Sequence, residues 1–199
     1  MNTHEMVMYG GAFNPPHRDH AGIIEKILEN TAEKVIIIPT GKRDDKNYSD
    51  VSNTDRETMI RLATEDFGNR VIIDTKFLYG DMPTTTRNQA FYLREKYGKE
   101  IPQVFGSDVA PRMAWWDSTG YVAHILPKVF IARPGYPIQE WMVSNYDELE
   151  YNSLGHSSTR VREEVAKVLV WSSRIEALKW MIHSKVFDFI LQNRLFQAS

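Results

Sequence analysis

The stretch MVMYGGAFNPPHRDH, residues 6–20, begins with apolar side chains and ends with two histidines. Met6 to Tyr9 predicts a short strand, and Gly10-Gly11 predicts a tight turn directly after it. Beyond His17, apolar residues recur at the spacing of one helix face, at Ile23, Ile24, Ile27 and Leu28. The stretch therefore predicts a strand, a glycine turn and a helix that begins near the histidines.

The same alternation continues along the chain. Val35 to Ile38 is an apolar run that Pro39 ends, which is typical of a strand buried on both faces. Further strands are expected at 71–74, 103–105 and 129–132, and helices at 55–67, 88–97, 158–169 and 185–193. This order predicts an α/β fold: a doubly wound, Rossmann-like parallel sheet with helices on both faces and a small C-terminal helical part. Without a visible linker or repeat, residues 1–199 are predicted to form one domain.

Composition excludes several classes of protein. Lys and Arg number 24 against 26 Asp and Glu, so 24 − 26 gives a formal charge of −2, which argues against a nucleic-acid-coating protein. Without cysteine there is no disulfide, thiolate metal site or thiol nucleophile. The N-terminus does not have the pattern of a signal peptide, and the longest aliphatic run is far too short to span a bilayer. A cytoplasmic location is predicted, with no membrane and no nucleic acid as partner.

The turn before the first helix has the chemistry of a phosphate site. In an open parallel sheet, ligands bind beyond the carboxyl ends of the strands, and the free N–H groups of a helix start favour anions. Gly10 and Gly11 let the backbone approach an anion closely. His17 and His20 are three residues apart, so both imidazoles would share one face of the first turn. The alternative is a glycine turn with surface histidines.

Residues 10–20 resemble the G-G-x-F-N-P-x-H-x-x-H motif of the nicotinate/nicotinamide mononucleotide adenylyltransferases, which belong to the HxGH nucleotidyltransferase superfamily. The match departs at Asp19, where that family usually has glycine, and a carboxylate there is expected close to the phosphate path. Residues 156–162, HSSTRVR, resemble the family's second motif, I-S-S-T-x-I-R, with His156 in place of isoleucine. Hydroxyls at a helix start bind anions, and Arg162, one turn further on, would reach the same phosphates.

Weaker resemblances fill the interval between the two motifs. They imply a phosphate contact for Lys46, a ribose contact for Asp108 and a contact with the pyridine ring for Trp116. The alternatives are a solvated loop lysine at 46 and a core tryptophan at 116.

The resemblance implies three sets of site residues and assigns none to a metal. The catalytic set is His17, His20 and Arg162. The ATP-binding set is Gly10, Gly11, Ala12, Phe13, Lys46, Gly106, Asp108, Ser157, Ser158 and Thr159. The mononucleotide-binding set is Asn14, Thr85, Thr86, Trp116 and Arg133.

The activity implied by the resemblance is a step of NAD biosynthesis. The adenylyl group of ATP would pass to nicotinamide or nicotinate mononucleotide, giving NAD or its deamido form plus pyrophosphate. Mg²⁺ is expected, bound mainly through the ATP phosphates. Asp117 stands where nicotinate-preferring bacterial enzymes often have tyrosine. Its charge would repel a carboxylate if it faced the ring, which favours nicotinamide or dual use.

Two other functions stay open. The domain would be a non-catalytic sensor of ATP or NAD if Asp19 weakens the chemistry. It would be another HxGH nucleotidyltransferase, such as the pantetheine-phosphate type, although opening motifs of that type usually lack F-N-P. The sequence leaves the choice of mononucleotide open, and also whether the chain forms a homo-oligomer.

Overall fold

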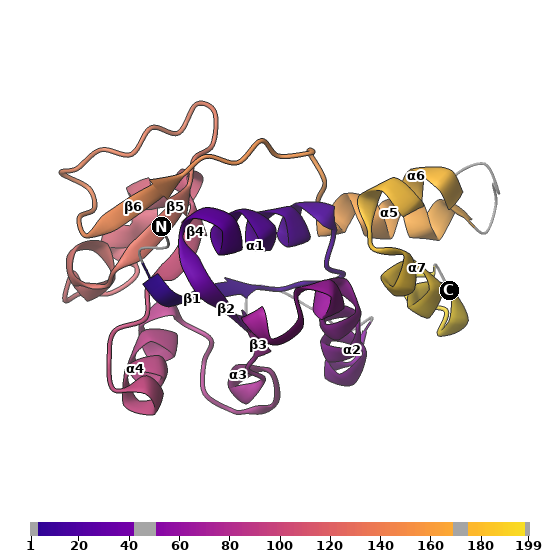
Figure 1. The fold of residues 1–199 in the computed structure, drawn as a ribbon, viewed down its shortest axis with the longest axis horizontal. Helices are drawn as coiled ribbons and strands as arrows, with labels where there is room; N and C mark the ends of the chain where they lie inside the picture. Colours follow the sequence, from indigo (N-terminus) through magenta and orange to yellow (C-terminus); the bar gives the residue numbers. More distant parts are fainter. Residues whose placement is uncertain (1–3, 42–50, 169–174, 198–199) are drawn as a thin grey trace.

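Six parallel strands form one sheet in the computed structural model, which describes residues 4–41, 51–168 and 175–197 (Figure 1). The strand order is β3-β2-β1-β4-β5-β6, and each neighbouring pair is parallel. The strands are β1 (His4–Gly11), β2 (Ala32–Pro39), β3 (Val71–Ile73), β4 (Gln103–Gly106), β5 (Lys128–Ile131) and β6 (Tyr146–Leu149). This order is that of the Rossmann fold, so the predicted fold class is confirmed.

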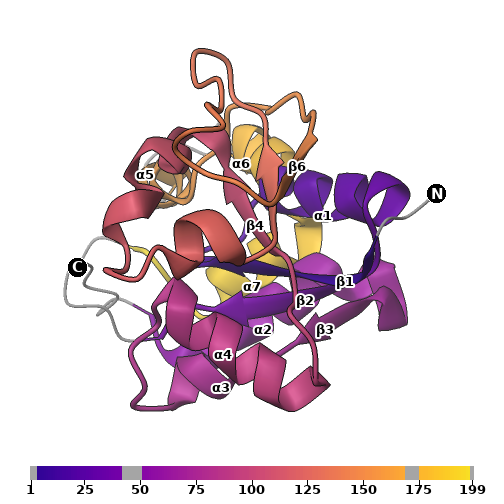
Figure 2. The ribbon, with the colours of Figure 1, turned by 90° about the vertical axis from the view of Figure 1, so that its left-hand side faces the viewer.

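Helices cover both faces of this sheet (Figures 1 and 2). They are α1 (Arg18–Asn30), α2 (Asn53–Thr64), α3 (Lys76–Tyr79), α4 (Thr86–Tyr97), α5 (Ser158–Val168), α6 (Ile175–Met181) and α7 (Ser184–Gln192). In both views α1 lies on one face, while α2, α3 and α4 lie on the other. None of the helices in the described ranges has the length and apolar character needed to cross a bilayer.

The two central strands are apolar on both faces because each face packs against helices. Val7 of β1 and Ile37 of β2 belong to the core that includes Ile27 of α1. Met8 and Ile36, which point the opposite way, belong to a second core that contains side chains of α3 and α4. Burying one such side chain contributes about 1.5–3 kcal/mol, so these two strands fix the centre of the sheet.

The structure has elements that the sequence pattern does not predict. The edge strand β6 has only Leu149 buried, so it lacks a clear two-residue alternation. The helix expected at 55–67 ends at Thr64 and is followed by a 3-10 helix over Glu65–Arg70, in which Gly68 has a φ of 57°. A second 3-10 helix, Ser107–Trp115, follows β4.

Arg56 of α2 lies beneath the glycine turn and is fully buried. Its Nη2 donates to the carbonyl oxygens of Ala12 and Thr40, at 2.7 Å each. These bonds join the turn after β1 to the residue that follows β2. The guanidinium therefore fixes the backbone from which the candidate site is built.

Replacing Arg56 with methionine is expected to lower the free energy of unfolding by about 3 kcal/mol, because two buried carbonyls lose charge-assisted hydrogen bonds. Urea denaturation monitored by tryptophan fluorescence measures the loss. Arg61→Met is the matched control, since Arg61 is exposed on the same helix and pairs with Glu57 one turn away. That change should cost at most about 1 kcal/mol. Equal losses in the two variants would contradict the role given to Arg56.

Candidate active site

A cavity of about 620 Å³ lies where the first and second motifs meet. His17 and His20 line it from the start of α1, and Arg133 lines it from the end of β5. Ser157 and Ser158 line it from the start of α5. Side chains from three separate parts of the chain thus reach one cavity at the carboxyl edge of the sheet, where ligands of such sheets bind.

The two histidines are held against each other. His17 precedes α1 as its N-cap, and the ring centroids of His17 and His20 are 3.8 Å apart. The backbone N–H of His17 donates to Nδ1 of His20 at 3.1 Å. Because Nδ1 accepts, neutral His20 carries its proton on Nε2, which is the tautomer that can donate to an anion.

Both imidazoles are poor bases in the folded protein. Burial, reinforced by the nearby His17, lowers the pKa of His20 to about 3. Burial also lowers the pKa of His17 to about 4, although the charge of Asp19 opposes this shift. Before a ligand binds, the rings are therefore neutral hydrogen-bond donors at neutral pH.

Asp19 lines the same cavity as the two histidines, and both of its oxygens also accept hydrogen bonds from within the protein. Its Oδ1 accepts from the Leu154 N–H at 2.6 Å, the Tyr151 hydroxyl at 3.0 Å and the Ser153 hydroxyl at 3.1 Å. Its Oδ2 accepts from the His156 N–H at 2.8 Å. Burial alone would raise the pKa of Asp19, but these four bonds outweigh it and the pKa is lowered. The carboxylate is used within the protein to hold the segment that precedes α5.

The two motifs also contact each other through α5. The Ser158 hydroxyl donates to the carbonyl of Pro15 at 2.8 Å, and Nη1 of Arg162 donates to the carbonyl of Asn14 at 2.7 Å. Nη2 of Arg162 donates to Thr159 Oγ1 at 3.2 Å. Arg162 is not among the residues that line the 620 Å³ cavity. It supports the turn in this structure, and its catalytic role stays a prediction.

Asp108 and Arg133, which the resemblance implies for different substrates, form an ion pair with Arg133 Nε 3.1 Å from Asp108 Oδ1. A Cβ at Gly106 would lie 2.4 Å from that oxygen and 2.6 Å from that nitrogen. The pair therefore requires glycine at 106. Arg133 lies in the cavity of the histidines rather than in a separate site.

The remaining predicted residues within the described ranges do not line this cavity. Thr85 caps α4, its Oγ1 accepting from Asn88 N–H at 3.2 Å. Trp116 is 40% exposed and packs edge-on against Phe105, whereas Trp115 is 86% exposed. Lys46 lies outside the described residues.

The sequence does not single out Tyr151 or Ser153, because nothing in the local sequence marks a contact made across more than 130 positions.

The expected effect of Asp117 on substrate choice rests on its facing the pyridine ring. In the structure Oδ1 accepts from the Thr119 N–H at 2.9 Å and Oδ2 from the Val122 N–H at 2.8 Å. Burial opposes ionisation, but the Thr119 hydroxyl and these N–H groups lower the pKa of Asp117 to about 2. Both oxygens are engaged by the following turn, which weakens the argument for nicotinamide from this charge.

Several buried polar atoms near the glycine turn have no hydrogen-bond partner within the described chain. They are Asn14 Oδ1, His17 Nδ1, Thr40 Oγ1, Gln89 Nε2 and His156 Nδ1. Each such group costs about 1–3 kcal/mol when left unsatisfied. A polar ligand or ordered water would satisfy them, which supports a binding site at this edge of the sheet.

Comparison with known proteins agrees with this geometry. A sequence model of the cytidylyltransferase-like family matches residues 8–164, which include both motifs. The chain belongs to this family. A relative from a Nitratiruptor species, named probable nicotinate-nucleotide adenylyltransferase, is 29% identical over 136 residues, covering 67% of this chain and 76% of its own. One from Opitutus terrae with the same name is 23% identical and covers 96% of each chain.

Solved structures show the same fold. Plasmodium falciparum nicotinic acid mononucleotide adenylyltransferase complexed with NaAD superposes with a TM-score of 0.80, at 20% identity and covering 96% of each chain. The same enzyme complexed with APC gives a TM-score of 0.73 at 19% identity, again covering 96% of each chain.

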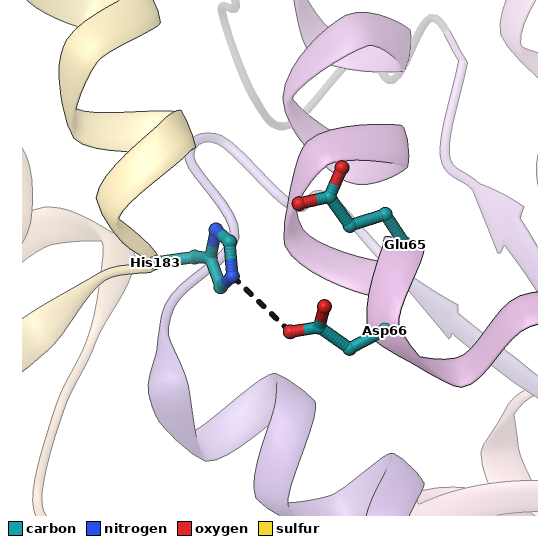
Figure 3. A group of neighbouring side chains, drawn as sticks. All are labelled: Glu65, Asp66 and His183. Atoms are coloured by element: carbon teal, nitrogen blue, oxygen red, sulfur yellow. Dashed lines mark ion pairs between the residues drawn. The ribbon is translucent and has the colours of Figure 1, made fainter.

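A second cluster of polar side chains joins the 3-10 helix Glu65–Arg70 to α7 (Figure 3). Ligand atoms of Glu65, Asp66 and His183 lie within 4.8 Å of one another. His183 Nδ1 accepts from the Lys185 N–H at 3.3 Å, so the neutral ring carries its proton on Nε2, 3.4 Å from Asp66 Oδ2. Lys185 Nζ lies 2.5 Å from Glu65 Oε1. We interpret the cluster as a Lys185–Glu65 ion pair and an imidazole–carboxylate contact that hold α7, because that tautomer leaves no free imidazole lone pair for a metal.

The lowered histidine pKa values predict a pH-dependent stability. Because they lie below the usual 6.5, the unfolded chain binds more protons than the folded protein as the pH falls through 6.5. Each histidine should remove roughly 1.4 kcal/mol of unfolding free energy per pH unit between about pH 6 and 4.5. Urea titrations at several pH values measure this slope. His20→Asn should reduce this slope by the contribution of one histidine, about 1.4 kcal/mol per pH unit. An unchanged slope would contradict the buried, neutral state of His20.

Proposed function

We propose that the protein transfers the adenylyl group of ATP to a pyridine mononucleotide, with nicotinate mononucleotide as the first substrate to test. One observation carries the proposal: Asn14, Pro15 and Asp19 of the first motif bond directly to residues 151–162, beside the cavity that His17 and His20 line. Both phosphate-binding motifs are thereby available to one triphosphate. The names of the relatives agree with this reaction.

In this reaction the 5′-phosphate of the mononucleotide attacks the α-phosphorus of ATP, and the bond to pyrophosphate breaks. The substrate supplies the nucleophile, so the protein contributes positioning and charge stabilisation. The Nε2–H of His20 donates to a phosphate oxygen, and the start of α5 supplies further donors. The negative phosphates also favour protonation of the neutral histidines, which then offset the charge that moves to the leaving group.

Mg²⁺ enters with ATP in this proposal. The carboxylates nearest the cavity have other partners, since Asp19 accepts four hydrogen bonds and Asp108 pairs with Arg133. This donor set fits a metal held by phosphate oxygens and water rather than by a protein cage. When bound, the ion would neutralise charge on the triphosphate.

The choice of nicotinate follows from two points. The relatives are named nicotinate-nucleotide adenylyltransferases, and both oxygens of Asp117 are engaged by its own turn. Nicotinamide mononucleotide is the competing substrate. The sensor alternative rests on Asp19, which lines the cavity and is engaged by four donors within the protein. The cytoplasmic location stays a prediction.

The direct test is pyrophosphate release from ATP and Mg²⁺ with each mononucleotide in separate reactions. We expect release with nicotinate mononucleotide and formation of the deamido dinucleotide, detected by chromatography. Release with nicotinamide mononucleotide alone would reverse the assignment of the substrate. ATP binding without release with either would favour a sensor.

His20→Ala is expected to lower the rate of adenylyl transfer by about a hundredfold or more, the scale for loss of one preorganised donor. Steady-state pyrophosphate release measures the rate. His124→Ala is the control, because His124 is exposed and contacts Ser144 rather than the cavity. Unchanged turnover in His20→Ala, with the fold intact by circular dichroism, would remove His20 from the reaction.

A further inference from the structure

Asp19 and the segment 151–156 form a contact that brings together positions far apart in the chain. The carboxylate belongs to the first turn of α1 and is only 4% exposed. Two of its four donors are backbone N–H groups, those of Leu154 and His156. Leu154 itself is 60% exposed, so burial of its side chain does not hold this segment in place. The hydrogen bonds to Asp19 hold this segment, together with the Tyr151 side chain, which packs against the core.

The surface of α1 is shaped for this contact. Asp19 and Gly22 are three residues apart, so they lie on the same face of the helix. A Cβ at Gly22 would come within 2.5 Å of the Tyr151 hydroxyl oxygen. Glycine at 22 thus lets the Tyr151 ring lie against the helix, where its hydroxyl reaches Asp19.

His156 is positioned by the same carboxylate. Its N–H bonds to Asp19 Oδ2 at 2.8 Å, and its Nδ1 lies 3.7 Å from that oxygen without a hydrogen-bond partner in the described chain. The residue lines the cavity together with His17 and His20. Asp19 and His156 are also two positions at which the motifs depart from the pattern they resemble, and the structure brings the two departures into contact.

We propose that Asp19 is a positioning residue for ATP: it fastens residues 151–156 to α1 and so places His156 and the start of α5 against the triphosphate. This role rests on the proposed function and adds to it. A carboxylate at the start of a helix is also favoured by the helix dipole, so the charge at 19 stabilises α1 while it holds the segment. The imidazole of His156 then faces the cavity beside the other two, as a third group able to donate to phosphate.

The test is Asp19→Asn, which keeps the shape of the side chain but leaves four donors facing one acceptor and an NH₂ group. We expect the Kd for ATP, measured by calorimetry without the second substrate, to rise at least about tenfold. That is the factor for losing one charge-assisted hydrogen bond to the triphosphate. In steady state, the KM for ATP should rise much more than the KM for the mononucleotide. Glu29→Gln, which removes an exposed carboxylate from the same helix, is the matched control and should leave both unchanged.

Hydrogen exchange measures directly whether residues 151–156 are held against α1. In Asp19→Asn the amides of Leu154 and His156 should exchange at least about tenfold faster, while amides of β1 and β4 keep their protection. Unchanged exchange at 154 and 156, or an unchanged Kd for ATP, would overturn the proposal. If Asp19→Asn does not fold, Tyr151→Phe removes one donor only and should raise the Kd about threefold. Neither the binding nor the exchange readout needs turnover, so a wild-type protein that releases no pyrophosphate refutes the proposed function without deciding the role of Asp19.

Discussion

Hydrogen bonds between residues 14–19 and residues 151–162 join two segments separated by more than 130 positions, and both segments line or support the candidate site. The parallel sheet brings the carboxyl ends of β1, β4 and β5 to one edge. It does not by itself bring the start of α5 there. That step depends on Asp19, the Pro15 carbonyl and the Asn14 carbonyl, which together accept the donors of the second segment.

Two buried charges hold segments that build the candidate site. The Arg56 guanidinium donates to the carbonyls of Ala12 and Thr40, whereas the Asp19 carboxylate accepts the N–H groups of Leu154 and His156. Each charge is matched with several polar partners, which offsets the cost of removing it from water.

The site is built from neutral donors before a ligand arrives. His17 and His20 have lowered pKa values because they are buried and adjacent, and atoms such as Gln89 Nε2 and Thr40 Oγ1 lack partners in the described chain. These features lower the stability of the unliganded protein. They are expected of a site in which a polyanion supplies the missing hydrogen bonds and the missing charge.

The sequence by itself determined the strand–turn–helix unit at residues 6–30, the parallel α/β class and the two histidines at the helix start. Each depends on local periodicity or on turn chemistry, which neighbouring residues encode. It did not predict β6, whose exposed edge position gives no regular pattern, or the environments of Arg56, Asp19 and Asp117. Only the tertiary structure decided these, because a carboxylate or guanidinium acts through whichever donors and acceptors the fold brings to it. For Asp19 those partners are residues 151–156, more than 130 positions away in the chain, so its role in holding this segment is a property of the folded protein.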